Sequence, residues 1–185
     1  MSGTGKGETR QLLLEAASQV VREAGVTRLT LEAVARTAGV SKGGLLYHFP
    51  TKNALIAGLV EDRLRRYDEA IEVAMAEDPD QGPGRWLRAY VHLTFDPTPD
   101  NINLTAPLLA AAGENPELLA PVWAAFARWQ ERAVADGVDP VVATLIRLAA
   151  DGLWFTDLFE AAPLDPALRA RVGETLRALA QRAAG

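Results

Sequence analysis

Apolar residues recur at three- and four-residue intervals along most of this chain, with polar residues between them. That spacing places apolar side chains together on one face of an α-helix. The segment 8–24 is a clear instance, and its apolar face comprises Leu13, Ala16, Ala17, Val20 and Val21. No segment shows the strict alternation of apolar and polar residues that is typical of a half-buried strand. The sequence therefore predicts an all-α protein.

A stretch near the N-terminus predicts two short helices joined by a tight turn. Thr30 can cap the first, 31–38, because its hydroxyl can accept a hydrogen bond from a free backbone N–H. Gly39 stands where that helix would end, in the left-handed conformation that glycine adopts without steric penalty. Ser41 can cap the second helix, 42–49. Two adjacent glycines in its first turn each cost about 1 kcal/mol relative to alanine, which indicates that another molecule approaches this backbone closely.

The remainder of the chain predicts further helices separated by loops. A long helix is expected over 52–76, followed by a linker rich in glycine and proline at 78–84. Three later helices share one start signal, an Asn or Asp cap followed by proline at the first helical position. These signals are Asn115-Pro116, Asp139-Pro140 and Asp165-Pro166, and they predict helices over 116–136, 140–161 and 166–183. Two more segments, near 83–95 and 101–112, bring the expected total to about nine helices.

Charge is distributed unevenly along the 185 residues, whose formal net charge is −5. Residues 1–52 hold seven Lys and Arg against four Asp and Glu, whereas the remainder holds twelve against twenty. A mildly basic N-terminal part followed by an acidic body fits a nucleic-acid-binding module. The chain has no cysteine, which excludes disulfides and thiolate metal sites. It shows no signal peptide and no membrane-spanning apolar run, so we expect a cytoplasmic protein without a membrane partner.

The motif at 30–52 resembles the DNA-binding head of the tetracycline-repressor (TetR) family. The positions that match the family pattern are Thr30, Ala35, Ala38, Gly39, Val40, Ser41, Lys42, Gly43, Leu45, Tyr47, His48, Phe49 and Lys52. Two positions depart from its commonest form. Gly44 stands where a polar residue such as Thr is usual, and Leu46 where an aromatic residue is common. Both lie on or near the second helix of the motif, so they bear on the base sequence that is read and not on the binding mode.

The resemblance implies that helix 42–49 enters the major groove of DNA, with its N-terminal residues against the base edges. Lys42 would donate to guanine or to phosphate, and Tyr47 would contact phosphate and sugar. The two glycines, Gly43 and Gly44, would let the backbone approach the bases. The other residues implied at the DNA surface are Thr30, Ser41, His48 and Lys52, mainly through phosphate contacts. Ordinary helix surface is the alternative for each of these side chains.

The C-terminal part is rich in aromatic residues and contains all four tryptophans. The resemblance implies that this body holds an effector pocket, and small-molecule pockets are largely apolar and lie between helices. The residues expected to line it are Trp86, Tyr90, Leu104, Leu108, Trp123, Phe126, Gln130 and Trp154. Ordinary core packing is the alternative for each of them. The expected effector is a small apolar or amphipathic molecule.

Two domains are expected: a DNA-binding domain at 1–50 and an effector-binding and dimerisation domain at 51–185. The resemblance implies a homodimer built through a four-helix bundle from helices 140–161 and 166–183 of each subunit. Two heads related by a two-fold axis would bind a palindromic operator far more tightly than one head. An effector would act through the long helix 52–76 and lower the affinity for DNA.

The sequence thus predicts a ligand-responsive transcriptional regulator, foremost a repressor, that uses no cofactor and no metal. It shows no catalytic set, no phosphate-binding glycine loop and no nucleophile elbow, so enzymatic activity is not expected. The alternative from another class is a helical small-molecule-binding protein or enzyme in which the N-terminal head only packs. Activation in place of repression also stays open.

Overall fold

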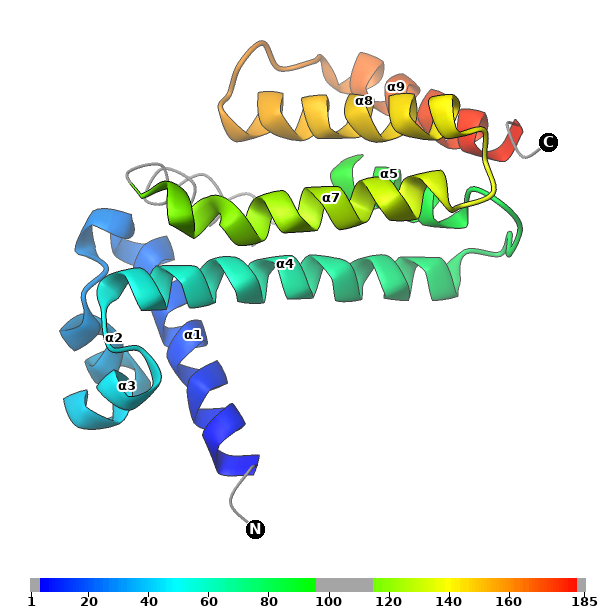
Figure 1. The fold of residues 1–185 in the computed structure, drawn as a ribbon. Helices are drawn as coiled ribbons and strands as arrows, with labels where there is room; N and C mark the ends of the chain where they lie inside the picture. Colours follow the sequence, from blue (N-terminus) through cyan, green and yellow to red (C-terminus); the bar gives the residue numbers. More distant parts are fainter. Residues whose placement is uncertain (1–3, 96–114, 183–185) are drawn as a thin grey trace. The chain divides into compact units, whose positions relative to one another are not determined.

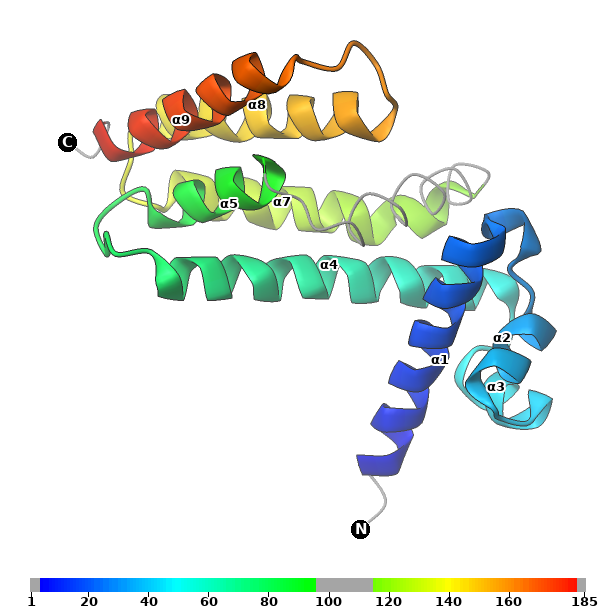
Figure 2. The same cartoon turned by 180° about the vertical axis from the view of Figure 1, so that it is seen from behind.

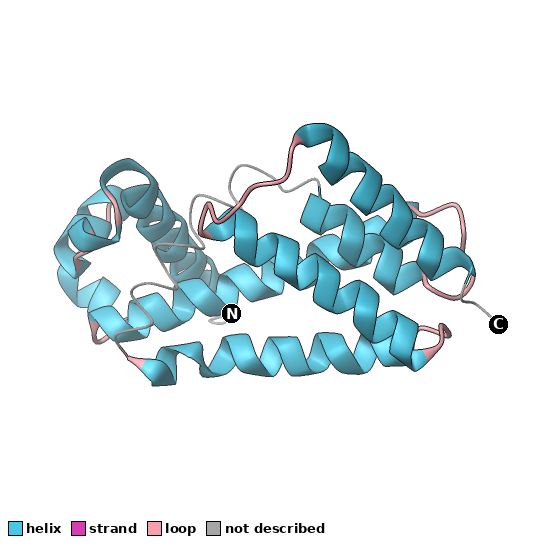
Figure 3. Cartoon of the chain, turned by 90° about the horizontal axis from the view of Figure 1, so that it is seen from above, coloured by secondary structure: helices cyan, strands magenta, loops and turns pink. Residues whose placement is uncertain are grey.

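The computed structural model describes residues 4–95 and 115–182. Every regular element in these ranges is a helix and none is a strand, which confirms the all-α class (Figure 3). The α-helices are α1 (Thr4–Ala24), α2 (Leu31–Ala38), α3 (Lys42–His48), α4 (Lys52–Glu77), α5 (Arg85–Phe95), α7 (Ala120–Val134), α8 (Pro140–Leu158) and α9 (Pro166–Arg182). Two 3-10 helices also occur, η1 (Val26–Arg28) and η2 (Pro116–Leu119). The helix expected near 101–112 lies outside the described residues.

The described residues form two compact units, and α4 and α7 contribute to both. The first unit comprises residues 4–64 with 115–122, and the second comprises 65–95 with 123–182. Along α4 the change from one unit to the other falls between Leu64 and Arg65. The domain boundary expected after residue 50 stays a prediction.

The helix-turn-helix forms with the caps that the sequence predicts. Thr30 Oγ1 accepts a hydrogen bond from the Ala33 N–H at 3.1 Å, and Ser41 Oγ accepts one from the Gly44 N–H at 3.1 Å. Gly39 has φ 67° and ends α2 in the left-handed conformation. The two caps and the glycine stop therefore fix the ends of α2 and the start of α3 by purely local contacts.

Apolar side chains fill the core of the first unit, in which α1 lies against α2 (Figure 1). The fully buried ones are Leu13, Leu14, Leu29, Val34, Leu45 and Leu55. Phe49, which follows α3, is also buried, and its ring lies directly on α4 at Gly58. A Cβ at position 58 would stand 2.7 Å from Phe49 Cε1. The ring can approach α4 this closely because the helix has a glycine there.

Several helix ends differ from the sequence-based expectation: α5 begins at Arg85 and not at residue 83, and α8 ends at Leu158 and not at residue 161. Two differences are larger. α1 begins at Thr4 and not at residue 8, and Thr9 Oγ1 donates to the Gly5 carbonyl at 2.7 Å within the added turn. The helix expected over 116–136 is divided into η2 and α7. The reason is Pro121, which has no N–H to donate to the Glu117 carbonyl, so an α-helix that started at Pro116 would lose that hydrogen bond.

In the second unit α5 packs against α8 and α9 (Figure 2). The connection 78–84 is ordered by Arg88, whose guanidinium donates to Asp78 Oδ2 at 2.8 Å and to the carbonyls of Asp80 and Pro83 at 2.6 and 2.9 Å. Gly84 has φ 81°, and a Cβ there would stand 2.4 Å from the Ala180 carbonyl oxygen. The segment predicted as a linker is therefore a fixed corner of the second unit.

Candidate functional site

The first turn of α3 has open space beside its backbone. A Cβ added at Gly43 would meet no atom within 4 Å, and one at Gly44 would meet only the capping Ser41 Oγ, at 3.3 Å. Packing within the protein therefore does not require a glycine at position 43. The space beside this turn is available to a second molecule.

Tyr47 stands out from the same helix with 70% of its surface exposed. The Lys6 ammonium lies 5.0 Å from the centre of its ring, and the His48 ring meets it edge-on at 5.2 Å. A cation over an aromatic face is attracted by the ring quadrupole. α1 and α3 thus bring a basic group and an exposed phenol together on one surface of the first unit.

Lys42, the first residue of α3, forms an ion pair with Glu32 in the first turn of α2. The Lys42 Nζ lies 2.5 Å from Glu32 Oε1, and both side chains are 60% exposed. The hydrogen bond from Lys42 holds the pKa of the Glu32 carboxyl below its usual range, with smaller contributions from a backbone hydrogen bond and the Lys42 charge. Glu32 therefore stays negatively charged beside the start of α3.

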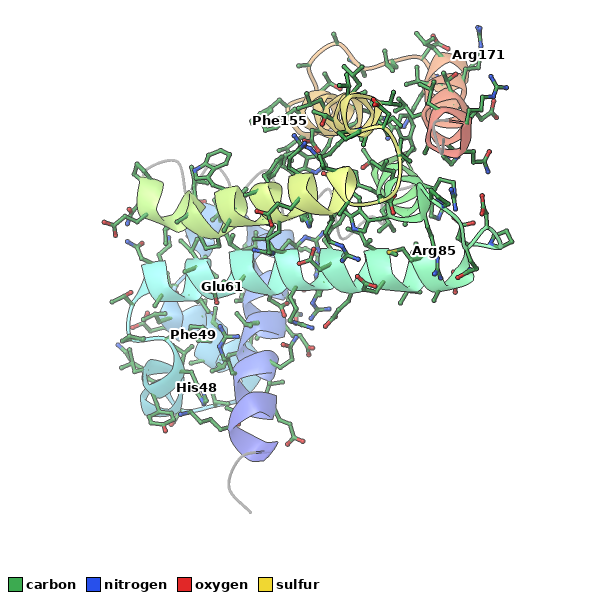
Figure 4. The ribbon with its side chains drawn as sticks, turned by 45° about the vertical axis from the view of Figure 1, so that its right-hand side comes forward. His48, Phe49, Glu61, Arg85, Phe155 and Arg171 are labelled. Carbon is green, nitrogen blue, oxygen red and sulfur yellow. The ribbon has the colours of Figure 1, made fainter. Side chains whose placement is uncertain are left out.

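The opposite face of α3 is anchored in the core. Leu45 and Phe49 are both buried. The Arg10 guanidinium lies 5.3 Å from the centre of the Phe49 ring and 3.3 Å from Glu61 Oε2 on α4 (Figure 4). One face of α3 is thus fixed by packing while Lys42 and Tyr47 remain open to solvent.

The other residues predicted to face DNA lie around this turn. Thr30 and Ser41 are exposed at the starts of α2 and α3, where each acts as a cap. Lys52 is exposed at the start of α4, and His48 is half-buried at the end of α3. The first unit thus contains all eight predicted residues, and their contact with DNA stays a prediction.

The predicted effector-binding residues are found in different settings. Trp86 and Tyr90 are buried, with their rings stacked at 4.9 Å. Phe126 and Trp154 are half-buried, with ring centres 6.2 Å apart, whereas Trp123 is 57% exposed. Leu104 and Leu108 lie outside the described residues. The structure brings Phe126 and Trp154 together and places Trp86 in the packed core, and the assignment of all eight to a pocket stays a prediction.

A buried polar network runs through this aromatic region. The Tyr90 hydroxyl donates to Asp151 Oδ1 at 2.5 Å, and Arg147 pairs with the other carboxylate oxygen. Arg147 Nε also donates to Gln130 Oε1 at 2.6 Å, and Gln130 Nε2 donates to Thr144 Oγ1 at 2.9 Å. Burial raises the pKa of the Tyr90 hydroxyl and that of the Asp151 carboxyl. Tyr90 consequently keeps its proton and acts as the donor.

Two members of this region, Tyr67 and Arg147, were not predicted from the sequence, and Trp129 was predicted only as one of the four tryptophans of the body. Tyr67 lies 5.2 Å from the Trp129 ring centre, and Trp129 Nε1 donates to Asp68 Oδ1 at 2.6 Å. Arg147 could have been found, because it stands four residues before Asp151 on a helix face that is otherwise apolar. Tyr67 gave no signal, since charged residues surround it in the sequence.

Within the described part of the chain, no set of three or more His, Asp or Glu side chains is arranged to hold a metal ion. Nor does any described helix combine the length and the apolar character that crossing a bilayer requires.

Two family matches together cover most of the chain. Residues 84–181 match the family described as "Tetracyclin repressor-like, C-terminal domain". Residues 13–59 match the family described as "Bacterial regulatory proteins, tetR family". The first match alone spans more than half of the 185 residues.

Individual proteins are also similar to this chain in sequence or in structure. The HTH-type transcriptional regulator BetI of Serratia proteamaculans is 32% identical over 87 residues, which are 47% of this chain and 44% of that protein. The chain thus spans less than half the length of this curated relative. A TetR-family member from Streptomyces coelicolor has 25% identity and a TM-score of 0.71, over 94% of this chain and 98% of that chain. The multidrug-binding protein EbrR, solved with imidazole, has 22% identity and a TM-score of 0.68, over 92% and 94% of the two chains.

Proposed function

This chain belongs to the TetR family of bacterial regulatory proteins, and from that premise we propose that it is a ligand-responsive transcriptional regulator, foremost a repressor. The observation that carries the proposal is the open first turn of α3, where Gly43 has free space on one side while Leu45 is buried on the other. A regulator of this kind would act on bacterial DNA in the cytoplasm.

DNA recognition is assigned to α3, with its N-terminal turn in the major groove. Lys42 would donate to a base edge or phosphate, and the exposed Tyr47 would contact phosphate and sugar. The N-termini of α2 and α4, at Thr30 and Lys52, would contact phosphates on either side. These roles together would fix both the depth and the orientation of the head on the duplex.

A homodimer is the proposed functional form, because α8 and the residue that follows it carry a stripe of apolar side chains that are exposed among the described residues. The exposed members recur at helical spacing, and they are Val141, Leu145, Leu148, Phe155 and Phe159. Gly152 lies in the same stripe with open space around it, and Figure 4 shows Phe155 projecting away from α8. An exposed apolar patch of this kind is typical of a protein–protein interface. A two-fold dimer would then present two copies of α3 to a palindromic operator.

The proposed effector is a small apolar or amphipathic molecule bound among the aromatic residues of the second unit. The half-buried rings of Phe126 and Trp154 would supply the largely apolar lining that such ligands require, with the half-buried Gln130, four residues after Phe126 on α7, as the polar group. EbrR, which shares the fold, is described as a multidrug-binding protein. Effector binding would weaken DNA binding by about 5- to 150-fold, the usual range for coupling between sites.

The DNA-binding proposal is tested by titrating the protein against a duplex from the region upstream of its own gene, at several salt concentrations. Tight binding with a steeply negative dependence on salt is expected, because phosphate contacts release counterions. Tyr47→Ala and Lys42→Ala should each weaken binding about tenfold or more, the loss of one good contact. The control is Arg182→Ala, which removes an exposed charge at the end of α9. Unchanged binding by both head variants would refute the assigned surface.

The dimer is tested by sedimentation with Leu145→Glu, which places a charge in the α8 stripe. We expect a monomer with about 10²- to 10⁴-fold weaker operator binding, because linked binding of the second head is lost. Val73→Glu is the matched control, since Val73 is also an exposed apolar residue but lies on α4. A Leu145→Glu protein that remains dimeric would place the interface elsewhere.

A further inference from the structure

Glu32 is an acidic side chain that forms an ion pair with the proposed reading helix α3, through Lys42. It lies in the first turn of α2, next to the cap Thr30, and its carboxylate stands 2.5 Å from the Lys42 ammonium. DNA phosphates close to Glu32 would repel its negative charge, so the Glu32 carboxylate lowers the affinity of the protein for DNA of any sequence. A role for Glu32 in DNA binding must therefore be something other than raising this affinity.

Another ion pair of the first unit differs from this one in its surroundings. Arg10 and Glu61 form a pair in which the guanidinium also lies over the ring of the buried Phe49, so that pair supports the core. Lys42 and Glu32 both keep 60% of their side-chain surface exposed. An ion pair between such exposed groups contributes little to stability. The ion pair with Glu32 instead restricts where the Lys42 ammonium can lie.

A lysine ammonium has three N–H donors on a flexible four-carbon stem. Without a partner it can reach many phosphate positions, whichever sequence is bound. When one donor is held by Glu32, the other two stay at the start of α3, beside the open space at Gly43. Two donors in a fixed position match the two acceptors, O6 and N7, that guanine presents in the major groove.

We propose that Glu32 is a positioning residue that makes Lys42 a base-reading group and keeps it from acting as a general phosphate contact. This inference rests on the proposed function, because it concerns the same DNA-binding surface. Removing the Glu32 charge should strengthen binding to arbitrary DNA while leaving operator binding unchanged or weaker. The ratio of the two affinities, which measures specificity, should therefore fall.

The test compares five proteins: the wild type, Glu32→Gln, Lys42→Met, the double variant of these two, and the charge control Glu23→Gln. Two duplexes of equal length and composition are used, one enriched by the wild-type protein from a random pool and one scrambled. For Glu32→Gln we expect about three- to tenfold tighter binding to the scrambled duplex, the range of one added phosphate contact. The slope of log K against log salt should become more negative by about 0.9 for each head, or about 1.8 for a dimer.

Three results separate the possible explanations. If the gain disappears in the Lys42→Met background, Glu32 acts through Lys42 and the proposal is supported. If the gain persists there, or if Glu23→Gln on α1 produces the same gain, only net charge matters and the proposal is wrong. If the wild type enriches no duplex, the proposed function itself fails, and that outcome is visible before any variant is measured. A change in α2 stability alone would not alter the salt slope.

Discussion

The cores of the two units differ in the kinds of side chain that they bury. Nearly all the buried side chains of the first unit are apolar, and its described part contains no tryptophan. The second unit buries Arg88, Thr94, Arg147 and Asp151 together with Trp86 and Trp129. Apolar contacts are non-directional, whereas each buried polar group must find a partner in the correct geometry. The second unit therefore depends much more on a few exact side-chain positions.

This difference shows where each unit is sensitive to change. In the first unit Lys42 and Tyr47 stand exposed on α3, over a largely apolar core that holds the helix in place. In the second unit the ion pair of Arg147 and Asp151 lies inside. A buried ion pair is seldom more stabilising than apolar residues of the same volume, but removing one partner is costly. Single substitutions should consequently have their largest effect on stability in the second unit and their largest effect on DNA binding in the first.

The largest expected effect is that of Asp151→Leu, which leaves the Arg147 charge buried without its carboxylate. Arginine does not lose its proton in proteins, so the charge cannot be removed by titration. We expect a loss of about 3–5 kcal/mol in the free energy of unfolding, measured by urea denaturation. The double variant Arg147→Met with Asp151→Leu should recover most of it. A loss below about 1 kcal/mol for the single variant would contradict the contrast between the two cores.

Gly58→Ala tests the apolar core of the first unit. The new Cβ would stand 2.7 Å from Phe49 Cε1 and 3.3 Å from Leu14 Cδ2, so the ring must move. Overpacking of this kind costs about 1–3 kcal/mol, partly offset by the better helix propensity of alanine. We also expect weaker DNA binding, because Phe49 directly follows α3. Gly7→Ala in α1 is the control, since its added Cβ meets no atom within 4 Å; equal effects of the two changes would refute the role of Gly58.

Gly43→Ala separates function from stability within the first unit. Because the Cβ meets no atom within 4 Å, the folded protein should be as stable as the wild type or slightly more so. The methyl group would occupy the space beside α3 that the proposal assigns to DNA. Operator binding should therefore weaken about tenfold, a loss of about 1.4 kcal/mol in the free energy of binding. Thermal unfolding and anisotropy titration measure the two effects. Unimpaired DNA binding would mean that the backbone of α3 does not approach the bases.

The smallest expected effect is that of removing a helix cap, and it should cost the same free energy of unfolding in both units. Ser41→Ala removes the cap of α3, and Asp165→Ala removes the cap of α9, whose carboxylate accepts hydrogen bonds from the Ala167 and Leu168 N–H groups at 3.1 and 3.0 Å. Each loss should cost about 1 kcal/mol in chemical denaturation. Capping is a local interaction, so its cost should not depend on the kind of core beneath. A several-fold difference between the two would show that tertiary contacts contribute to one of the caps.

The sequence predicted both helices of the helix-turn-helix, and each of their four ends lies within one residue of its predicted position. The prediction was accurate because Thr30, Gly39 and Ser41 act on their immediate neighbours. It also predicted α8 and α9 from the two Asp-Pro starts. The helix from residue 116 was predicted incorrectly, since Pro121 breaks it one turn later. Tyr67 was not predicted, because the charged residues near it along the chain give no sign that it is half-buried among aromatic rings.

The sequence by itself determined the all-α class and the helix caps, since periodic spacing and capping both depend on residues no more than about one helical turn apart. Only the tertiary structure decided which polar groups meet: Lys42 with Glu32, Tyr90 with Asp151, and Trp129 with Asp68. Contacts of this second kind join separate helices. They depend on how the helices pack, which a periodic pattern along one helix does not specify.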